Sequence, residues 1–127
     1  MRFIADFMLG KLARMLRLLG QDVIYVRPAD RNGMLKMALE EGRVILTRSH
    51  KLPHHPSIFI IKNQDWREQL EEVKKAFPLD INPFTRCSIC NTKLVEVPKP
   101  AVRGKVPYHV YEAHDEFAYC PGCGRYY

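Results

Sequence analysis

Residues 1–20 have the sequence MRFIADFMLGKLARMLRLLG. The segment from Arg2 to Ala5 predicts a short strand that ends at Asp6. Apolar residues then recur every three or four positions from Met8 to Leu19, which predicts an amphipathic helix, and Gly20 suits its end. Basic residues lie three apart on the other side of this helix: Lys11, Arg14 and Arg17. A carboxylate at a strand end beside a basic helix could hold a metal ion next to a polyanion. Asp6 could equally be only a helix cap, and the basic side only a solvated surface.

The next part of the chain alternates between predicted strands and helices. In order, we expect a strand over Asp22–Val26, a helix capped by Asn32 that runs to Glu41, a strand over Arg43–Thr47, a strand over Ser57–Ile61 and a helix over Asp65–Phe77. This alternation predicts an α/β fold with a parallel sheet of about four strands and right-handed crossovers. With the first strand in the interior of the sheet, Asp6 would lie near Thr47, Arg48 and Ser49.

The composition changes at Pro78–Pro83, which we interpret as a hinge. Beyond it, prolines and glycines are frequent, and no helical period runs through the segment between the two cysteine pairs. We therefore expect two domains, residues 1–83 with the parallel sheet and residues 84–127 as a small β-rich module.

Four cysteines form two C-x2-C pairs, Cys87 with Cys90 and Cys120 with Cys123, with 29 residues between the pairs. Two such pairs resemble the knuckles of a zinc ribbon, in which four thiolates hold one structural Zn²⁺ in a tetrahedron. Two disulfides, or a redox-active C-x-x-C, are less favoured alternatives in a chain expected to be cytoplasmic. His109 and His114 lie between the pairs, but four cysteines already complete a zinc site.

The formal net charge of +6 arises entirely in residues 1–62, which hold 11 Lys and Arg against 5 Asp and Glu. Such an excess favours an acidic partner, most commonly nucleic acid. We found neither a long uncharged apolar run nor a secretion signal, so we expect a cytoplasmic protein without membrane insertion.

The chain resembles a known family, the PIN-like ribonucleases with a C-terminal zinc ribbon, which also occur as the final domain of some mutator-type exoribonucleases. The resemblance covers nearly the whole chain. It depends on residues 3–20, on Gly42 to Arg48, on both cysteine pairs, and on the stretch His114-Asp115-Glu116-Phe117.

The resemblance implies a PIN-like, Rossmann-like sheet with acidic residues at the carboxyl ends of strands, a divalent Mg²⁺ or Mn²⁺ ion, and RNA as substrate. Asp6 matches the first acid of the family, and Asp30 matches the acidic pair before the second helix. Where the family usually has Thr-Arg-Asp, this chain has Thr47-Arg48-Ser49. A hydroxyl is a poorer ligand than a carboxylate for a hard dication.

Three functional hypotheses follow. The first is a metal-dependent ribonuclease that cleaves by metal-activated water, with Asp6 and Asp30 as metal ligands and Ser49 at the site. Its phosphate contacts would be Lys11, Arg14, Arg17 and Arg48. The second is a nucleic-acid-binding module, descended from such a nuclease, whose catalysis is impaired at Ser49. The third is a mononucleotide binder, although no glycine-rich phosphate loop is present. Glu40 and Glu41 are further acidic candidates, and we discount Asp22 because it begins a strand.

Overall fold

The computed structural model describes all of residues 1–127. Its main sheet has four parallel strands in the order β2-β1-β3-β4, so the first strand is interior, as predicted. The strands are β1 (Arg2–Ala5), β2 (Asp22–Tyr25), β3 (Val44–Thr47) and β4 (Ile58–Ile60). The prediction of a mixed α/β fold with a parallel sheet is therefore confirmed.

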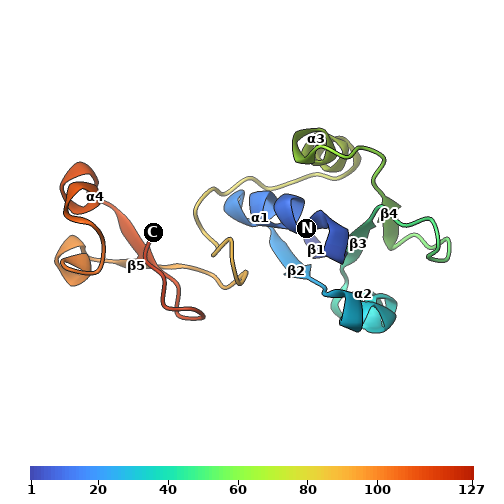
Figure 1. The fold of residues 1–127 in the computed structure, drawn as a ribbon, viewed down its shortest axis with the longest axis horizontal. Helices are drawn as coiled ribbons and strands as arrows, with labels where there is room; N and C mark the ends of the chain where they lie inside the picture. Colours follow the sequence, from blue (N-terminus) through green and yellow to red (C-terminus); the bar gives the residue numbers. More distant parts are fainter.

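Helices cover both faces of this sheet (Figure 1). One face carries α1 (Gly10–Leu18) and α3 (Trp66–Ala76), and the other carries α2 (Met34–Glu41). Side chains alternate along β1 accordingly, since Phe3 and Ala5 join the core under α1, whereas Ile4 joins the core under α2. Both faces are thus buried, as in parallel sheets generally.

Two short 3-10 helices change the predicted boundaries. The first predicted helix is divided into η1 (Phe7–Leu9) and α1, and η2 (Pro28–Gly33) precedes α2. The prediction that Asn32 caps the second helix was wrong. Pro28, with its fixed backbone angle, begins η2 and places Asn32 inside it, so that Gly33 precedes α2 without a side-chain cap.

The C-terminal segment forms a second, antiparallel sheet of β5 (Val95–Val97) and β6 (Phe117–Tyr119). Between these strands lie η3 (Lys99–Val102) and a six-residue helix, α4 (Tyr108–Ala113), which we did not predict. Tyr111 of α4 stacks on Phe117, with 6.3 Å between ring centroids. This helix is too short to show a period in sequence, and Tyr111 packs it against β6.

The segment between the two sheets is attached to the end of α1. Asn82 and Phe84 donate backbone hydrogen bonds to the carbonyls of Leu19 and Leu18. Gly20 has a φ of +90°, and a Cβ there would collide with the carbonyl of Asn82. Glycine at this position therefore allows residues 82–85 to pass directly beside the helix end.

The first cysteine loop also contacts the edge strand β2. The Asn91 side chain accepts a hydrogen bond of 2.9 Å from the backbone N–H of Val23, and Arg17 Nε donates one of 2.9 Å to the Val23 carbonyl. Arg17 also donates to the carbonyls of Ser88 and Ile89. The loop between Cys87 and Cys90 is therefore held against α1 and β2.

Candidate active site, metal centre and nucleic-acid interface

Asp6 lies at the carboxyl end of β1, and its side chain is fully buried. Its carboxylate accepts hydrogen bonds from the Phe7 backbone at 2.9 Å and from the Thr47 hydroxyl at 2.7 Å. This contact confirms the prediction that β1 and β3 end side by side. Ser49 lies next to the pair, since its backbone N–H donates to the Thr47 hydroxyl at 3.0 Å.

The main partner of Asp6 is Arg31, which the sequence analysis missed. Arg31 extends from η2 and donates two hydrogen bonds of 3.0 Å, from Nε and Nη2, one to each oxygen of the Asp6 carboxylate. Its guanidinium also lies over the Phe7 ring, 5.4 Å from the centroid. A buried carboxylate needs a partner, but no local sequence signal identifies Arg31 as that partner, because it lies 25 residues from Asp6.

The other acidic candidates are engaged elsewhere. Asp30 is exposed and pairs with Arg27 at 3.2 Å. Glu40 pairs with Lys36 on the surface of α2, and Glu41 with Arg43, a residue that precedes β3. Glu41 therefore lies at the amino-terminal edge of the sheet, opposite Asp6.

These residues do not fit a catalytic Mg²⁺ or Mn²⁺ ion in the arrangement described. Such ions prefer six oxygen ligands, commonly including one or two carboxylates. Here both oxygens of the Asp6 carboxylate are bound by Arg31, and the Ser49 hydroxyl accepts from the Lys51 backbone at 3.2 Å. The four cysteines form the single cluster of three or more metal-binding side chains in the structure.

The four predicted phosphate contacts differ in their surroundings. Arg14 is exposed and forms none of the ion pairs of the protein, while Lys11 lies 5.6 Å from the centroid of the Trp66 ring. Arg48 has a buried Nε without a hydrogen-bond partner. Arg17 is only 7% exposed, and its guanidinium is bound by backbone carbonyls. The prediction of a phosphate contact for Arg17 does not agree with this burial, because its donors hold the cysteine loop instead.

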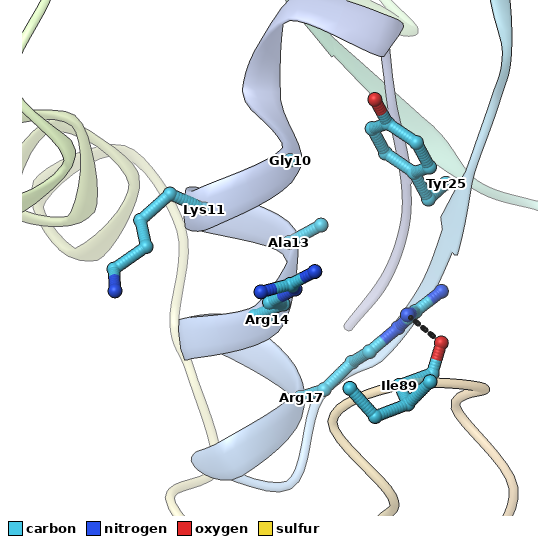
Figure 2. Close-up of a pocket in the computed structure, with 7 residues that line it drawn as sticks. All are labelled: Gly10, Lys11, Ala13, Arg14, Arg17, Tyr25 and Ile89. Atoms are coloured by element: carbon cyan, nitrogen blue, oxygen red, sulfur yellow. Dashed lines mark hydrogen bonds between the residues drawn. The ribbon is translucent and has the colours of Figure 1, made fainter.

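A hollow of about 380 Å³ lies between α1, β2 and the first cysteine loop. Figure 2 shows Arg14 and Ala13 on the α1 side, Tyr25 on β2, and Ile89 on the loop below. Lys11 extends away from the other side chains at the rim. The hollow thus combines cationic groups with an aromatic and an aliphatic wall.

The four cysteines converge as predicted, with all Sγ atoms within 4.8 Å of one another. The Sγ atoms of Cys87 and Cys123 are 3.6 Å apart, and those of Cys90 and Cys120 are 3.4 Å apart. A tetrahedral zinc with bonds of about 2.3 Å would separate its sulfurs by roughly 3.8 Å. The residues therefore fit Zn²⁺ with four protein ligands, which suits a structural ion. The cluster includes neither His109 nor His114.

Two neighbours support the cysteine cluster. The Tyr127 hydroxyl lies 2.9 Å from the Cys87 sulfur. Burial alone would raise the pKa of Cys87, but the hydrogen bonds from Tyr127 and from backbone amides outweigh it and lower the pKa to about 6. The thiolate, which is the zinc-binding form, is thereby favoured. At Gly122, a Cβ would collide with the Thr92 hydroxyl, so glycine is needed for the two loops to approach.

Asp22 connects the two parts of the chain. Its Oδ1 accepts from Arg43 at 2.8 Å and from the Asn91 side chain at 2.8 Å, and Arg86 lies 3.8 Å from Oδ2. Burial would raise the Asp22 pKa, but these partners outweigh it and lower the pKa to about 2 from an ordinary value of 3.8. Asp22 is thus a structural residue that the sequence analysis did not identify.

This pKa predicts an acid-sensitive contribution to stability. Because the folded-state value lies below the unfolded one, the stabilisation is complete above about pH 4 and is lost as the pH falls through about 2. We expect Asp22→Asn to lower the free energy of unfolding by on the order of 2 kcal/mol at neutral pH, and by progressively less below pH 4. Urea denaturation of both proteins across this range measures the difference, and a difference independent of pH would contradict the assignment.

The fold and sites define a class: an α/β domain with a parallel sheet, a buried acid at a strand end, a basic helix and a four-cysteine module. Comparison with protein-family models matches residues 1–127 to the model described as "Mut7-C RNAse domain". The chain belongs to this family. Comparisons with curated proteins and with solved structures gave no match. None of the helices combines the length and apolar character needed to span a membrane.

Proposed function

We propose that this chain is a ribonuclease-type domain that binds RNA through the basic side of α1 and the adjoining end of β3. The family match supports ribonucleic acid as the partner. The observation that carries the proposal is Arg14, an exposed cation on α1 that forms no ion pair within the protein. Phosphate oxygens would provide the missing acceptors.

A second cation, Arg48, is partly buried at the end of β3, near the start of α1. Arg48 directly follows Thr47, whose hydroxyl lies 4.0 Å from the Met8 sulfur in η1, and η1 leads into the turn of α1 that carries Lys11. The order β2-β1-β3-β4, with the first strand in the interior, also supports our assignment of the sheet to the PIN-like, Rossmann-like type.

The proposal predicts salt-dependent RNA binding that depends on Arg14. Binding of a labelled single-stranded RNA, followed by fluorescence anisotropy between about 50 and 200 mM salt, should weaken steeply as counterions compete. Arg14→Ala should weaken binding several-fold and reduce the slope of log affinity against log salt by about 0.7, the value for one phosphate contact.

Lys36→Ala is the matched control for this measurement. Lys36 is an exposed cation on α2, which covers the other face of the sheet. Its loss removes the same charge and should leave RNA affinity nearly unchanged. If both substitutions weaken RNA binding equally, the affinity depends only on the net charge of the protein, and the proposal of a specific binding surface is contradicted.

A second candidate function is metal-dependent cleavage of RNA with Mg²⁺ or Mn²⁺, with Asp6, Asp30 and Ser49 at the site. The juxtaposition of Asp6 and Thr47 at adjoining strand ends favours it. Arg31 would first have to leave the Asp6 carboxylate, and Asp30 would have to leave Arg27 and turn towards Asp6. Assays of RNA cleavage with Mn²⁺, with chelator and with Ser49→Asp separate the candidates. Cleavage that needs Mn²⁺ and is lost in Asp6→Ala supports an active nuclease, whereas binding without cleavage in any metal supports the binding module.

A further inference from the structure

The hollow between α1 and the first cysteine loop is lined in part by two exposed side chains that carry no charge, Tyr25 and Ile89. Tyr25 is 40% exposed and Ile89 is 45% exposed, although large apolar side chains of this kind are usually buried in the core of a protein. They line the hollow from two parts of the chain, β2 and the loop between Cys87 and Cys90 (Figure 2). Neither residue belongs to the basic surface described above.

Both walls are held in place by hydrogen bonds. The Tyr25 hydroxyl donates to the carbonyl of Phe7, which fixes the ring beside the start of α1. The carbonyl of Ile89 accepts a hydrogen bond of 3.0 Å from Arg17, as the dashed line in Figure 2 shows. The Tyr25 ring and the backbone of the loop that carries Ile89 are therefore held in place before a ligand binds, which lowers the entropic cost of binding.

Tyr25 lies close to Gly10 of α1. A Cβ at Gly10 would lie 3.6 Å from the Tyr25 hydroxyl oxygen and 3.7 Å from a ring carbon. These are ordinary van der Waals distances, so the ring lies beside the first turn of α1. A volume of about 380 Å³ is at the lower end of the range for small-ligand sites, roughly 300–1,000 Å³.

We infer that this hollow binds one unpaired nucleotide of single-stranded RNA, with the base against Tyr25 and Ile89 and a phosphate towards Arg14. The inference rests on the proposed RNA binding and adds the substrate class. Bases of single strands stack on aromatic side chains, whereas bases in a duplex are paired and face inward. The first cysteine loop is then part of the RNA-binding surface, through Ile89.

Binding of single-stranded and duplex RNA by Tyr25 and Ile89 variants tests this assignment. Stacking on one aromatic side chain is worth about 1–3 kcal/mol, so Tyr25→Ala should weaken single-strand binding by about 5- to 140-fold. Ile89→Ala should weaken it by a smaller factor. Tyr25→Phe retains the ring and should retain most of the affinity. The wild-type protein should bind single-stranded RNA more tightly than a duplex of the same length.

Tyr108→Ala is the matched control, because Tyr108 is 77% exposed on α4 and does not line the hollow. Photocrosslinking with a 5-iodouridine-containing RNA gives an independent readout, and the modified peptide should contain Tyr25. If Arg14→Ala weakens RNA binding but the Tyr25 and Ile89 variants bind normally, the subsite is wrong and the proposed function stands. If the wild-type protein binds no RNA, both are wrong.

Discussion

Arg31→Ala is expected to lower the free energy of unfolding by about 3 kcal/mol, the lower end of the range for removing one partner of a buried ion pair. The substitution leaves the Asp6 carboxylate, which is fully buried, without the guanidinium that binds both of its oxygens. Arg31 itself is 30% exposed, so water can enter where the side chain was and limit the loss. Urea denaturation, followed by circular dichroism, measures the change.

Arg27→Ala is the control for this measurement. Arg27 is in the same segment and pairs with Asp30, but the two side chains are 77% and 55% exposed. An exposed pair contributes about 0–1 kcal/mol. Similar losses in both variants would show that the Arg31 pair is no stronger than a surface contact.

The Arg31→Ala protein also tests whether the strand-end site can accept a metal. A ligand that binds only the folded state raises the melting temperature as its concentration increases. A Mn²⁺-dependent rise in Arg31→Ala that is absent in the wild type would mean that Arg31 competes with the ion for Asp6. The same small response in both proteins would count against the metal-dependent candidate.

Removal of zinc is expected to unfold residues 84–127 while the parallel sheet of residues 1–83 persists. In the C-terminal module only Cys87, Val102, Phe117 and Cys120 are buried, which is too little for a core. Metal binding in such sites supplies on the order of 10 kcal/mol of folding free energy at neutral pH. Limited proteolysis of Cys87→Ser, or of chelator-treated protein, should therefore cut within residues 84–127 and leave an N-terminal fragment.

The same experiment tests the proposed domain boundary. The hydrogen bonds of Arg17 and Asn91 cross between the two parts, so we also expect the N-terminal fragment to melt a few degrees lower than the N-terminal part of the zinc-bound protein. Chelator-treated wild type and Cys87→Ser should agree. Loss of both sheets in one transition would mean that the parts share one folding unit and that the boundary at residue 83 is wrong.

The backbone arrangement was largely predictable because its signals are local. Apolar runs predicted the strands, and the alternation of strands with helices predicted the parallel sheet. The 3.6-residue period predicted α1 and α3 to within about two residues at each end. The spacing of the cysteines predicted their cluster, since each pair is a local turn whose geometry is repeated in many metal-binding proteins.

Side-chain partners were much harder to predict. Arg14 and Arg17 are three residues apart on one helix, yet one is exposed and the other is buried against the cysteine loop 71 and 72 residues away. Nothing local distinguishes them. Arg31 was missed for the same reason, because only the folded chain shows that η2 passes over the end of β1. Long-range contacts decide which charged groups remain available for a ligand.

The hydrogen bonds of the Val23 backbone with the Asn91 and Arg17 side chains affect how the protein can associate in solution. β2 is an outermost strand, and the outward N–H and carbonyl of Val23 would otherwise be free to pair with a strand of another molecule. Asn91 and Arg17 occupy both groups. Since the cysteine loop positions Asn91, zinc bound to the four cysteines would also protect this edge strand from pairing with another molecule. Metal-depleted protein would present an open template for intermolecular β-pairing, even where its parallel sheet is still folded.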